Sequence, residues 1–143
     1  MPDGEYHVGL ILDADDVIVE FDETNNAVVE RTAALTVGPT LEVSRLIRGA
    51  EANLTVHGAQ AGEKVTFAVS LATGDGPCPM PGVCLDLVNP KVIGAELADA
   101  QGAATLNVTV PQSVPAGKTA WFQSVVHRGP ASVVTNLDSE TVQ

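Results

Sequence analysis

The chain has 143 residues, of which 45% are hydrophobic and 17% charged, so it can bury a core and lies outside the composition range of disordered chains. Its 18 acidic residues and 7 Lys and Arg residues give a net charge of −11, which disfavours nucleic acid as a partner because an acidic surface repels phosphate. Apolar runs such as residues 8–12 are too short for a membrane helix, so we expect no membrane insertion.

The acidic residues are concentrated at the start of the chain. Residues 1–37 hold nine acidic residues and one basic residue, for a net charge of −8, whereas residues 38–143 have a net charge of −3. The composition changes at Gly38-Pro39, which is a turn-forming pair. We therefore expect an acidic unit at 1–38 and a larger domain at 39–143.

Short strands and no helices are predicted along the chain. Val and Thr favour strands because branching at Cβ restricts their rotamers, and apolar residues alternate with polar ones with a period of two. Turn signals such as Ala61-Gly62-Glu63 separate the runs. The predicted strands are 6–12, 17–20, 27–37, 41–43, 52–56, 65–71, 93–97, 106–110, 119–126 and 132–135, the last resuming to Val142.

This pattern predicts an all-β chain in which an immunoglobulin-like antiparallel β-sandwich is preceded by a β-hairpin. About seven strands fall within 40–143, the number found in an immunoglobulin-like domain. Alternation places six residues on the inward face of the sandwich: Leu54, Val56, Phe67, Val69, Leu106 and Val108. By the same alternation Leu71 continues the row of Phe67 and Val69, and Ile93, Ala95 and Leu97 share one face.

The acidic unit carries a spaced motif followed by an alternating strand. Its residues are Tyr6, Asp13, Asp15, Val17, Glu20, Glu23, Asn25 and Asn26. Residues 4–37 thereby resemble the C-terminal hairpin of the bacterial cell-adhesion-related domain (CARDB). The resemblance covers the last third of that sandwich and implies that 1–38 is an incomplete adhesion-type sandwich, whose natural partners are earlier strands.

The larger domain has motifs of its own. They are 61–67 (AGEKVTF), 76–79 (GPCP), 84–87 (CLDL), 98–104 (ADAQGAA), 115–117 (PAG) and 122–123 (FQ). Residues 41–143 thereby resemble an immunoglobulin-like module of long secreted proteins of myxobacteria and their relatives. The resemblance implies an extracellular or cell-surface β-sandwich of a multidomain protein, with no assigned activity.

The two cysteines predict a structural disulfide. Cys78 and Cys84 flank a loop rich in Pro and Gly, which bends enough to bring them together. Their spacing fits neither a zinc site nor a C-x-x-C redox motif. A disulfide here would pin a long loop between strands and indicates an oxidising compartment.

The acidic cluster of the N-terminal unit has two interpretations. Six carboxylates at close spacing suit Ca²⁺, which binds six to eight oxygens; the candidate ligands are Asp13, Asp15, Asp16, Glu20, Asp22 and Glu23. Alternatively, such side chains cap turns by accepting backbone N–H bonds. No cofactor other than calcium is expected.

The histidines and serines of the chain show no motif that is typical of a catalytic site. His7, His57 and His127 lie in strand-like runs, and no serine stands in a nucleophile elbow, so we expect no catalytic residues. Trp121 and Phe122 are adjacent and point to opposite faces of a strand, so one belongs to the core and the other is exposed or covered by a partner.

Together these patterns indicate a non-enzymatic structural or adhesive module of a bacterial surface or extracellular assembly. Its expected partners are other protein chains, with self-association through the N-terminal hairpin; a strand-complemented filament is one such arrangement. The alternative is an extracellular ligand-binding module for a glycan or calcium.

Overall fold

The structure is a computed structural model that describes residues 4–6, 9–11, 27–29 and 35–143. The chain divides into two compact units, Met1–Gly38 and Pro39–Gln143.

The first unit contains two nested antiparallel strand pairs. β1 (Gly4–Tyr6) pairs with β4 (Leu35–Val37), and β2 (Gly9–Ile11) pairs with β3 (Ala27–Val29). This nesting of the first strand with the last, and of the second with the third, is the pairing order of a hairpin.

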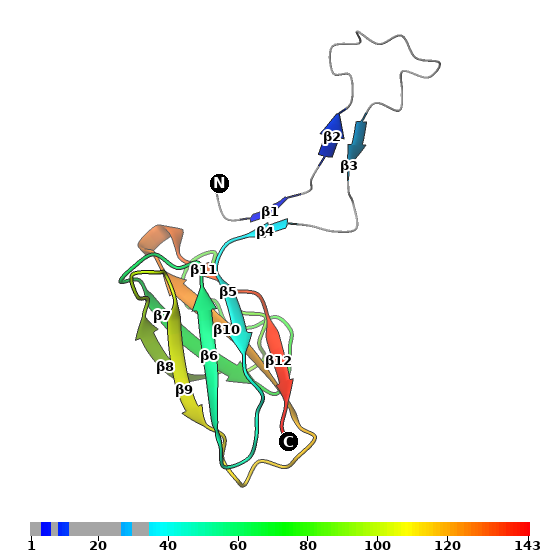
Figure 1. The fold of residues 1–143 in the computed structure, drawn as a ribbon, viewed down its shortest axis with the longest axis vertical. Helices are drawn as coiled ribbons and strands as arrows, with labels where there is room; N and C mark the ends of the chain where they lie inside the picture. The colour runs from blue at the N-terminus through cyan, green and yellow to red at the C-terminus, as the bar shows by residue number, and fades with distance from the viewer. Residues whose placement is uncertain (1–3, 7–8, 12–26, 30–34) are drawn as a thin grey trace. The chain divides into compact units, whose positions relative to one another are not determined.

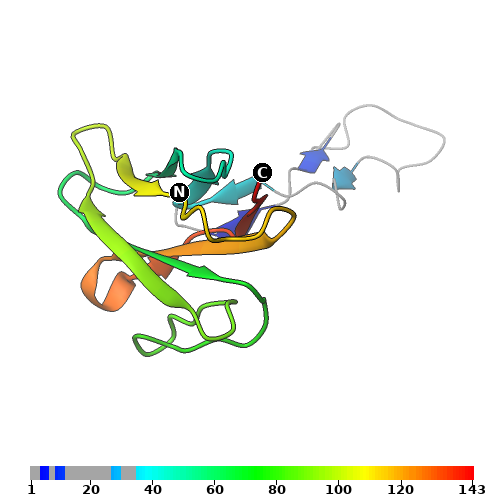
Figure 2. The ribbon, with the colours of Figure 1, turned by 90° about the horizontal axis from the view of Figure 1, so that it is seen from below.

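The second unit consists of two antiparallel sheets that form separate layers (Figures 1 and 2). The first sheet has the order β5 (Thr40–Val43), β6 (Glu51–His57) and β9 (Ala104–Thr109). The second has the order β8 (Lys91–Leu97), β7 (Lys64–Ser70) and β10 (Thr119–His127), and both β11 (Val133–Val134) and β12 (Asp138–Thr141) pair with β10. A short 3₁₀ helix, η1 (Gly129–Ala131), precedes β11. The predicted all-β antiparallel sandwich is confirmed.

The main core lies between the two sheets, where the sequence alternation placed it. Leu54, Val56 and Phe67 are fully buried and Leu106 is buried, whereas their neighbours Asn53 and Asn107 are exposed. Val69 and Val108 are half-buried and pack against the same cluster. The predicted inward face is therefore confirmed, with its two half-buried members at the margin of the core.

The predicted faces of β8 are wrong beyond Ile93. Phe67 pairs with Gly94 and Ala68 with Val92, so Ile93 is an extra residue in the ladder. A bulge of this kind exchanges the two faces of a strand. Ala95 and Leu97 are consequently exposed, and Ile93 is the member of the predicted row that packs against the core.

Leu71 was also predicted to point inward, and this prediction is wrong. β7 ends at Ser70, so Leu71 lies beyond the last paired residue of the strand and is 71% exposed. The chain then leaves the sheet and returns only at Lys91, where β8 begins.

The segment between these strands, residues 71–90, covers the outer face of the second sheet. Val83, Leu85 and Leu87 form a separate buried cluster with Ala68 and Val125 of the sheet, and Trp121 packs against this cluster. Phe122 lies in the main core between the sheets. The two adjacent aromatic residues thus occupy opposite faces, as predicted, and Trp121 is covered by the protein's own loop.

A buried glutamine fastens the 71–90 segment to the sheet. The Oε1 atom of Gln123 accepts a hydrogen bond from the Asp86 backbone N–H at 2.8 Å, and its Nε2 donates to Oδ2 of Asp86 and to the Thr135 carbonyl at 3.0 and 3.2 Å. The Gln123 side chain is 1% exposed, and its bond to the Thr135 carbonyl is buried. Gln123 on β10 therefore joins the loop to the residue that follows β11.

The predicted disulfide is present in this segment. Cys78 and Cys84 are bonded, with 1.97 Å between their sulfur atoms. Both residues are exposed, and the closed loop also holds the bridge between Met80 and Val83.

Replacing both cysteines with serine should lower the free energy of unfolding by roughly 2 kcal/mol, because the small closed loop removes limited entropy from the unfolded chain. Denaturant titration of the two proteins measures this difference. Mass spectrometry of the unreduced wild-type protein, isolated without reductant, should find no free thiol; two free thiols would contradict the bond.

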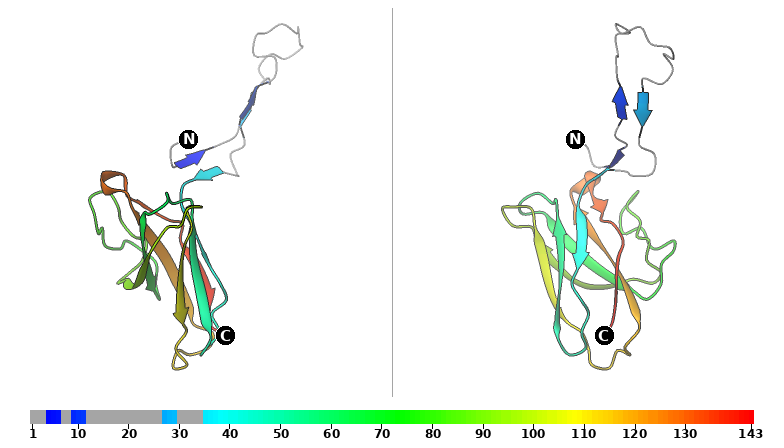
Figure 3. Two further views of the ribbon diagram at one scale, coloured as in Figure 1. Left: turned by 60° about the vertical axis from the view of Figure 1, so that its left-hand side comes forward. Right: turned by 45° about the vertical axis from the view of Figure 1, so that its right-hand side comes forward.

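One pair of sheet edges is closed by side chains. The backbone N–H of Leu41 on β5 donates to Oδ1 of Asn136 at 2.7 Å, and Nδ2 of Asn136 donates back to the Leu41 carbonyl at 3.1 Å. The N–H of Val43 donates to Oδ2 of Asp138 at 2.9 Å. Asn136 and Asp138 therefore join the first sheet to the second and occupy backbone groups of β5. Figures 1 and 3 show the red C-terminal strand, β12, beside the cyan strand β5.

The other pair of edges is formed by β8 and β9. Within the described part of the chain, β8 pairs only with β7 and β9 only with β6. Gly94 lets these edges approach, because a Cβ atom there would lie 2.7 Å from Cδ1 of Leu106. The sandwich thus has one edge tied by polar side chains and one edge without such ties among the described residues.

Candidate docking surface

The sandwich has two ends, which differ in composition. The chain enters at Pro39, at the end that also holds the 58–63 and 98–103 turns; this is called the proximal end (Figure 1). The 44–50 and 110–118 loops, the beginning of the 71–90 segment and the C-terminus lie at the opposite, distal end.

The proximal end is held by an ion pair and backbone bonds. Arg128 Nε donates to Glu63 Oε1 at 2.8 Å, and its Nη2 donates to the Gly58 carbonyl at 3.1 Å. The Ala59 N–H donates to the Gly102 carbonyl, which joins the two turns.

The distal loops are bonded to each other and to the C-terminus. The N–H of Gly49 donates to the Val110 carbonyl at 2.8 Å, and the N–H of Gln143 donates to the Leu46 carbonyl at 2.8 Å. The N–H of Gly117 donates to the Val142 carbonyl at 2.8 Å. These bonds give the distal end a defined shape.

An apolar cavity of about 310 Å³ opens at the distal end between the sheets. All of its lining residues except Lys91 and Thr109 are apolar. They come from both sheets and from the distal loops, and they include Leu46, Val69, Leu71, Ile93, Val110, Val114 and Phe122. The cavity therefore exposes the end of the main core.

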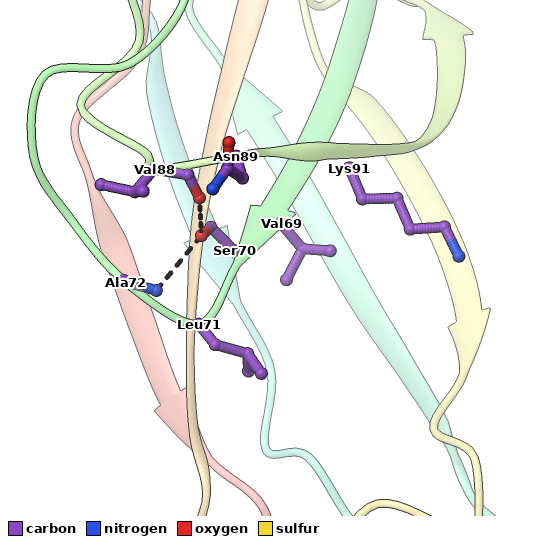
Figure 4. A pocket seen from close by; sticks show the side chains of 7 residues that line it. All are labelled: Val69, Ser70, Leu71, Ala72, Val88, Asn89 and Lys91. Carbon is purple, nitrogen blue, oxygen red and sulfur yellow. Dashed lines mark hydrogen bonds between the residues drawn. The ribbon is translucent and has the colours of Figure 1, made fainter.

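A second cavity of about 390 Å³ adjoins the first, since Val69, Leu71 and Lys91 line both. Figure 4 shows the Ser70 hydroxyl holding its wall: it donates to the Val88 carbonyl and accepts from the Ala72 N–H. The two cavities together are called the distal groove.

Exposed apolar and basic side chains lie at the distal end, and two of them, Leu71 and Lys91, line the groove. Leu71 is 71% and Ile47 47% exposed. Four of the six basic residues of the second unit lie at this end: Arg45, Arg48, Lys91 and Lys118, all exposed. The acidic residues of the strand ends here are Glu51 and Glu140. An exposed apolar surface with a polar rim is typical of a protein interaction site.

The residues predicted for calcium binding, Asp13, Asp15, Asp16, Glu20, Asp22 and Glu23, lie outside the described residues. Within the described residues there is no group of three or more His, Cys, Asp or Glu side chains that could hold a metal ion. Of the histidines, His57 is exposed, the Nε2 atom of His127 lies 2.9 Å from Oγ1 of Thr66, and His7 is not among the described residues. The calcium site remains a prediction.

Sequence reasoning missed the distal groove. Leu71 was expected to continue the inward row of Phe67 and Val69, and Lys91 lay outside the predicted strand 93–97. The one signal in the sequence is the length of the 71–90 segment, which joins two adjacent antiparallel strands and is far longer than a hairpin turn requires.

The polypeptide described here contains no helix that is both long and apolar enough to span a membrane. Comparison with protein-family models and with curated proteins found no match. Among solved structures, the chain is similar to superoxide reductase (neelaredoxin) from Ignicoccus hospitalis, with 9% identity, a TM-score of 0.47, and coverage of 75% of this chain and 81% of that one. At this level the similarity assigns no activity to the chain.

Proposed function

We propose that the protein is a non-enzymatic structural or adhesive module of a bacterial surface or extracellular assembly, and that it associates with other copies through its acidic N-terminal unit. The single observation that carries this proposal is the exposed apolar groove at the distal end of an otherwise well-packed sandwich. An exposed apolar surface with polar residues around it is typical of a site that another protein covers.

The buried polar residues of the sandwich support a structural role. Gln123 and Asp86 fasten the 71–90 segment, and Thr135 Oγ1 accepts from the Ser124 N–H at 3.0 Å. The Ser132 hydroxyl accepts from the Arg128 N–H at 2.8 Å and donates to the Gly129 carbonyl. The hydrogen bonds of these polar groups are made within the sandwich and hold its loops and strands together.

Two further features support an extracellular, immunoglobulin-like module. The disulfide between Cys78 and Cys84 is typical of proteins from oxidising compartments. The layered arrangement of a three-stranded sheet on a sheet of β8, β7 and β10 with short additional strands agrees with the immunoglobulin-like class. The motifs shared with CARDB and with the myxobacterial-type module fit the same proposal.

Deleting residues 1–38 tests the proposal. The remaining unit, Pro39–Gln143, contains both buried clusters and should fold alone. Light scattering after size-exclusion chromatography should find that the intact chain associates as its concentration rises, whereas the shortened chain stays monomeric. An intact chain that remains a folded monomer throughout the micromolar range would contradict the proposal.

A further inference from the structure

We propose that the distal groove is the acceptor site for residues 13–23 of a second copy of the chain. This inference rests on the proposed function, since it names the surface through which the copies associate. The partner is identified by three properties of the groove: its apolar lining, its basic rim and the strand edge beside it.

The apolar lining matches the middle of the proposed ligand segment. Residues 13–23 read DADDVIVEFDE, so the middle of the segment has four apolar residues, Val17, Ile18, Val19 and Phe21, with Glu20 between the last two. The groove offers apolar side chains from both sheets, among them Leu71, Val108 and Phe122. Burying these apolar residues in a preformed apolar groove removes both surfaces from water, which favours binding.

The basic rim matches the flanks of the same segment. Residues 13–23 contain six acidic residues and no basic one. Arg45, Arg48, Lys91 and Lys118 stand exposed at the distal end. Opposite charges on the two surfaces steer their encounter and fix the orientation of binding, and both effects weaken as salt concentration rises.

The strand edge gives the backbone of the segment a partner. β8 begins at Lys91, which lines both cavities of the groove, and its outer edge has no paired strand among the described residues. An extended segment can add to such an edge through main-chain hydrogen bonds while its alternate side chains enter the adjacent groove. The opposite edge, at β5, is occupied by Asn136 and Asp138.

A second copy is the expected donor of the segment. Pro39 is buried, and the next residue, Thr40, pairs with His57 at the proximal end, so the chain enters the sandwich at the end opposite the groove. Binding of an N-terminal segment of one copy to the distal end of another joins different surfaces of identical chains. A contact of this head-to-tail type propagates into an open chain of copies unless its rotation closes a ring.

The test compares two matched substitutions in the full-length chain. Leu71→Glu introduces a negative charge into the groove, and Leu97→Glu introduces the same charge at the proximal end of β8; the two leucines are 71% and 67% exposed. Sedimentation velocity at rising concentration should show self-association at least about tenfold weaker for Leu71→Glu, since an unpaired charge is placed in the interface. Leu97→Glu should associate like the wild-type chain.

A second pair of variants tests whether the loss of association comes from the altered contact rather than from local misfolding. Lys91→Glu reverses a charge of the rim and should weaken association, whereas Lys64→Glu makes the same reversal at the proximal end and should not. Both lysines are exposed, so thermal unfolding of the two variants should match that of the wild type. Raising the salt concentration should weaken the association of the wild-type chain. The difference in association strength between the wild-type chain and Lys91→Glu should then become smaller.

The possible outcomes separate this inference from the proposed function. If the wild-type chain stays monomeric, for example because the segment binds its own sandwich, both are wrong. If the wild-type chain associates, the shortened chain lacking 1–38 does not, and Leu71→Glu associates as strongly as Leu97→Glu, the proposed function stands and the distal groove is not the acceptor.

Discussion

Replacing Phe67 with alanine should lower the free energy of unfolding by about 3–5 kcal/mol, the range observed when a large aromatic side chain is removed from a core. Phe67 is completely buried on β7, between the two sheets. Its ladder partner across β7 and β8 is Gly94, which has no side chain to fill the space, and its partner on β10 is Ser124. The truncation should therefore leave a cavity that the neighbours cannot close.

The matched control is Leu97→Ala on the adjacent strand. Leu97 is 67% exposed, so its truncation should change the free energy of unfolding by less than about 0.5 kcal/mol. Denaturant titration of both variants measures the difference. A loss under about 1 kcal/mol for Phe67→Ala would place this residue outside the core and contradict the arrangement of the sheets.

Gly102→Ala should be the most damaging substitution among the turns, lowering the free energy of unfolding by about 3 kcal/mol through backbone strain and a steric clash. Gly102 has a φ of +79°, and a Cβ atom there would lie 2.1 Å from the carbonyl oxygen of Ala59. The Ala59 N–H donates to the Gly102 carbonyl, so the two backbones are held against each other. Neither turn can move aside without losing this bond.

Gly117 provides the control for backbone strain alone. Its φ is +80°, and a Cβ atom there would meet nothing within 4 Å. Gly117→Ala should therefore cost only about 1 kcal/mol, the expected penalty for a left-handed conformation. Equal unfolding midpoints for Gly102→Ala and Gly117→Ala would show that the 58–63 and 98–103 turns do not abut as described.

Alternation was sufficient to predict the inner faces of β6, β7 and β9, because regular ladders preserve the two faces of a strand along its length. The same reasoning failed on β8, where the extra residue Ile93 exchanges the faces. The sequence around Gly94 does not reveal this bulge, since its position depends on the close approach of β8 to Leu106 on another strand. The position of the bulge is determined by tertiary packing, which the residue pattern of one strand does not show.

The distal groove could not be predicted from the sequence, again because it depends on tertiary packing. Spacing alone suggested the bond between Cys78 and Cys84, but nothing in the sequence indicated that 71–90 folds back over the sheet. That arrangement depends on Gln123, a buried polar residue of β10, which bonds the Asp86 backbone 37 positions away. Because the return path leaves Leu71 uncovered, the distal groove became visible only in three dimensions.

The most direct test of head-to-tail association mixes two chains that each lack one half of the contact. The chain without residues 1–38 keeps the groove but lacks the acidic segment, and full-length Leu71→Glu keeps the segment but carries the altered groove. Sedimentation velocity should find each chain monomeric by itself and a heterodimer of one copy of each in the mixture. A mixture in which both folded chains remain monomeric, although the wild-type chain associates at the same concentration, would contradict the account.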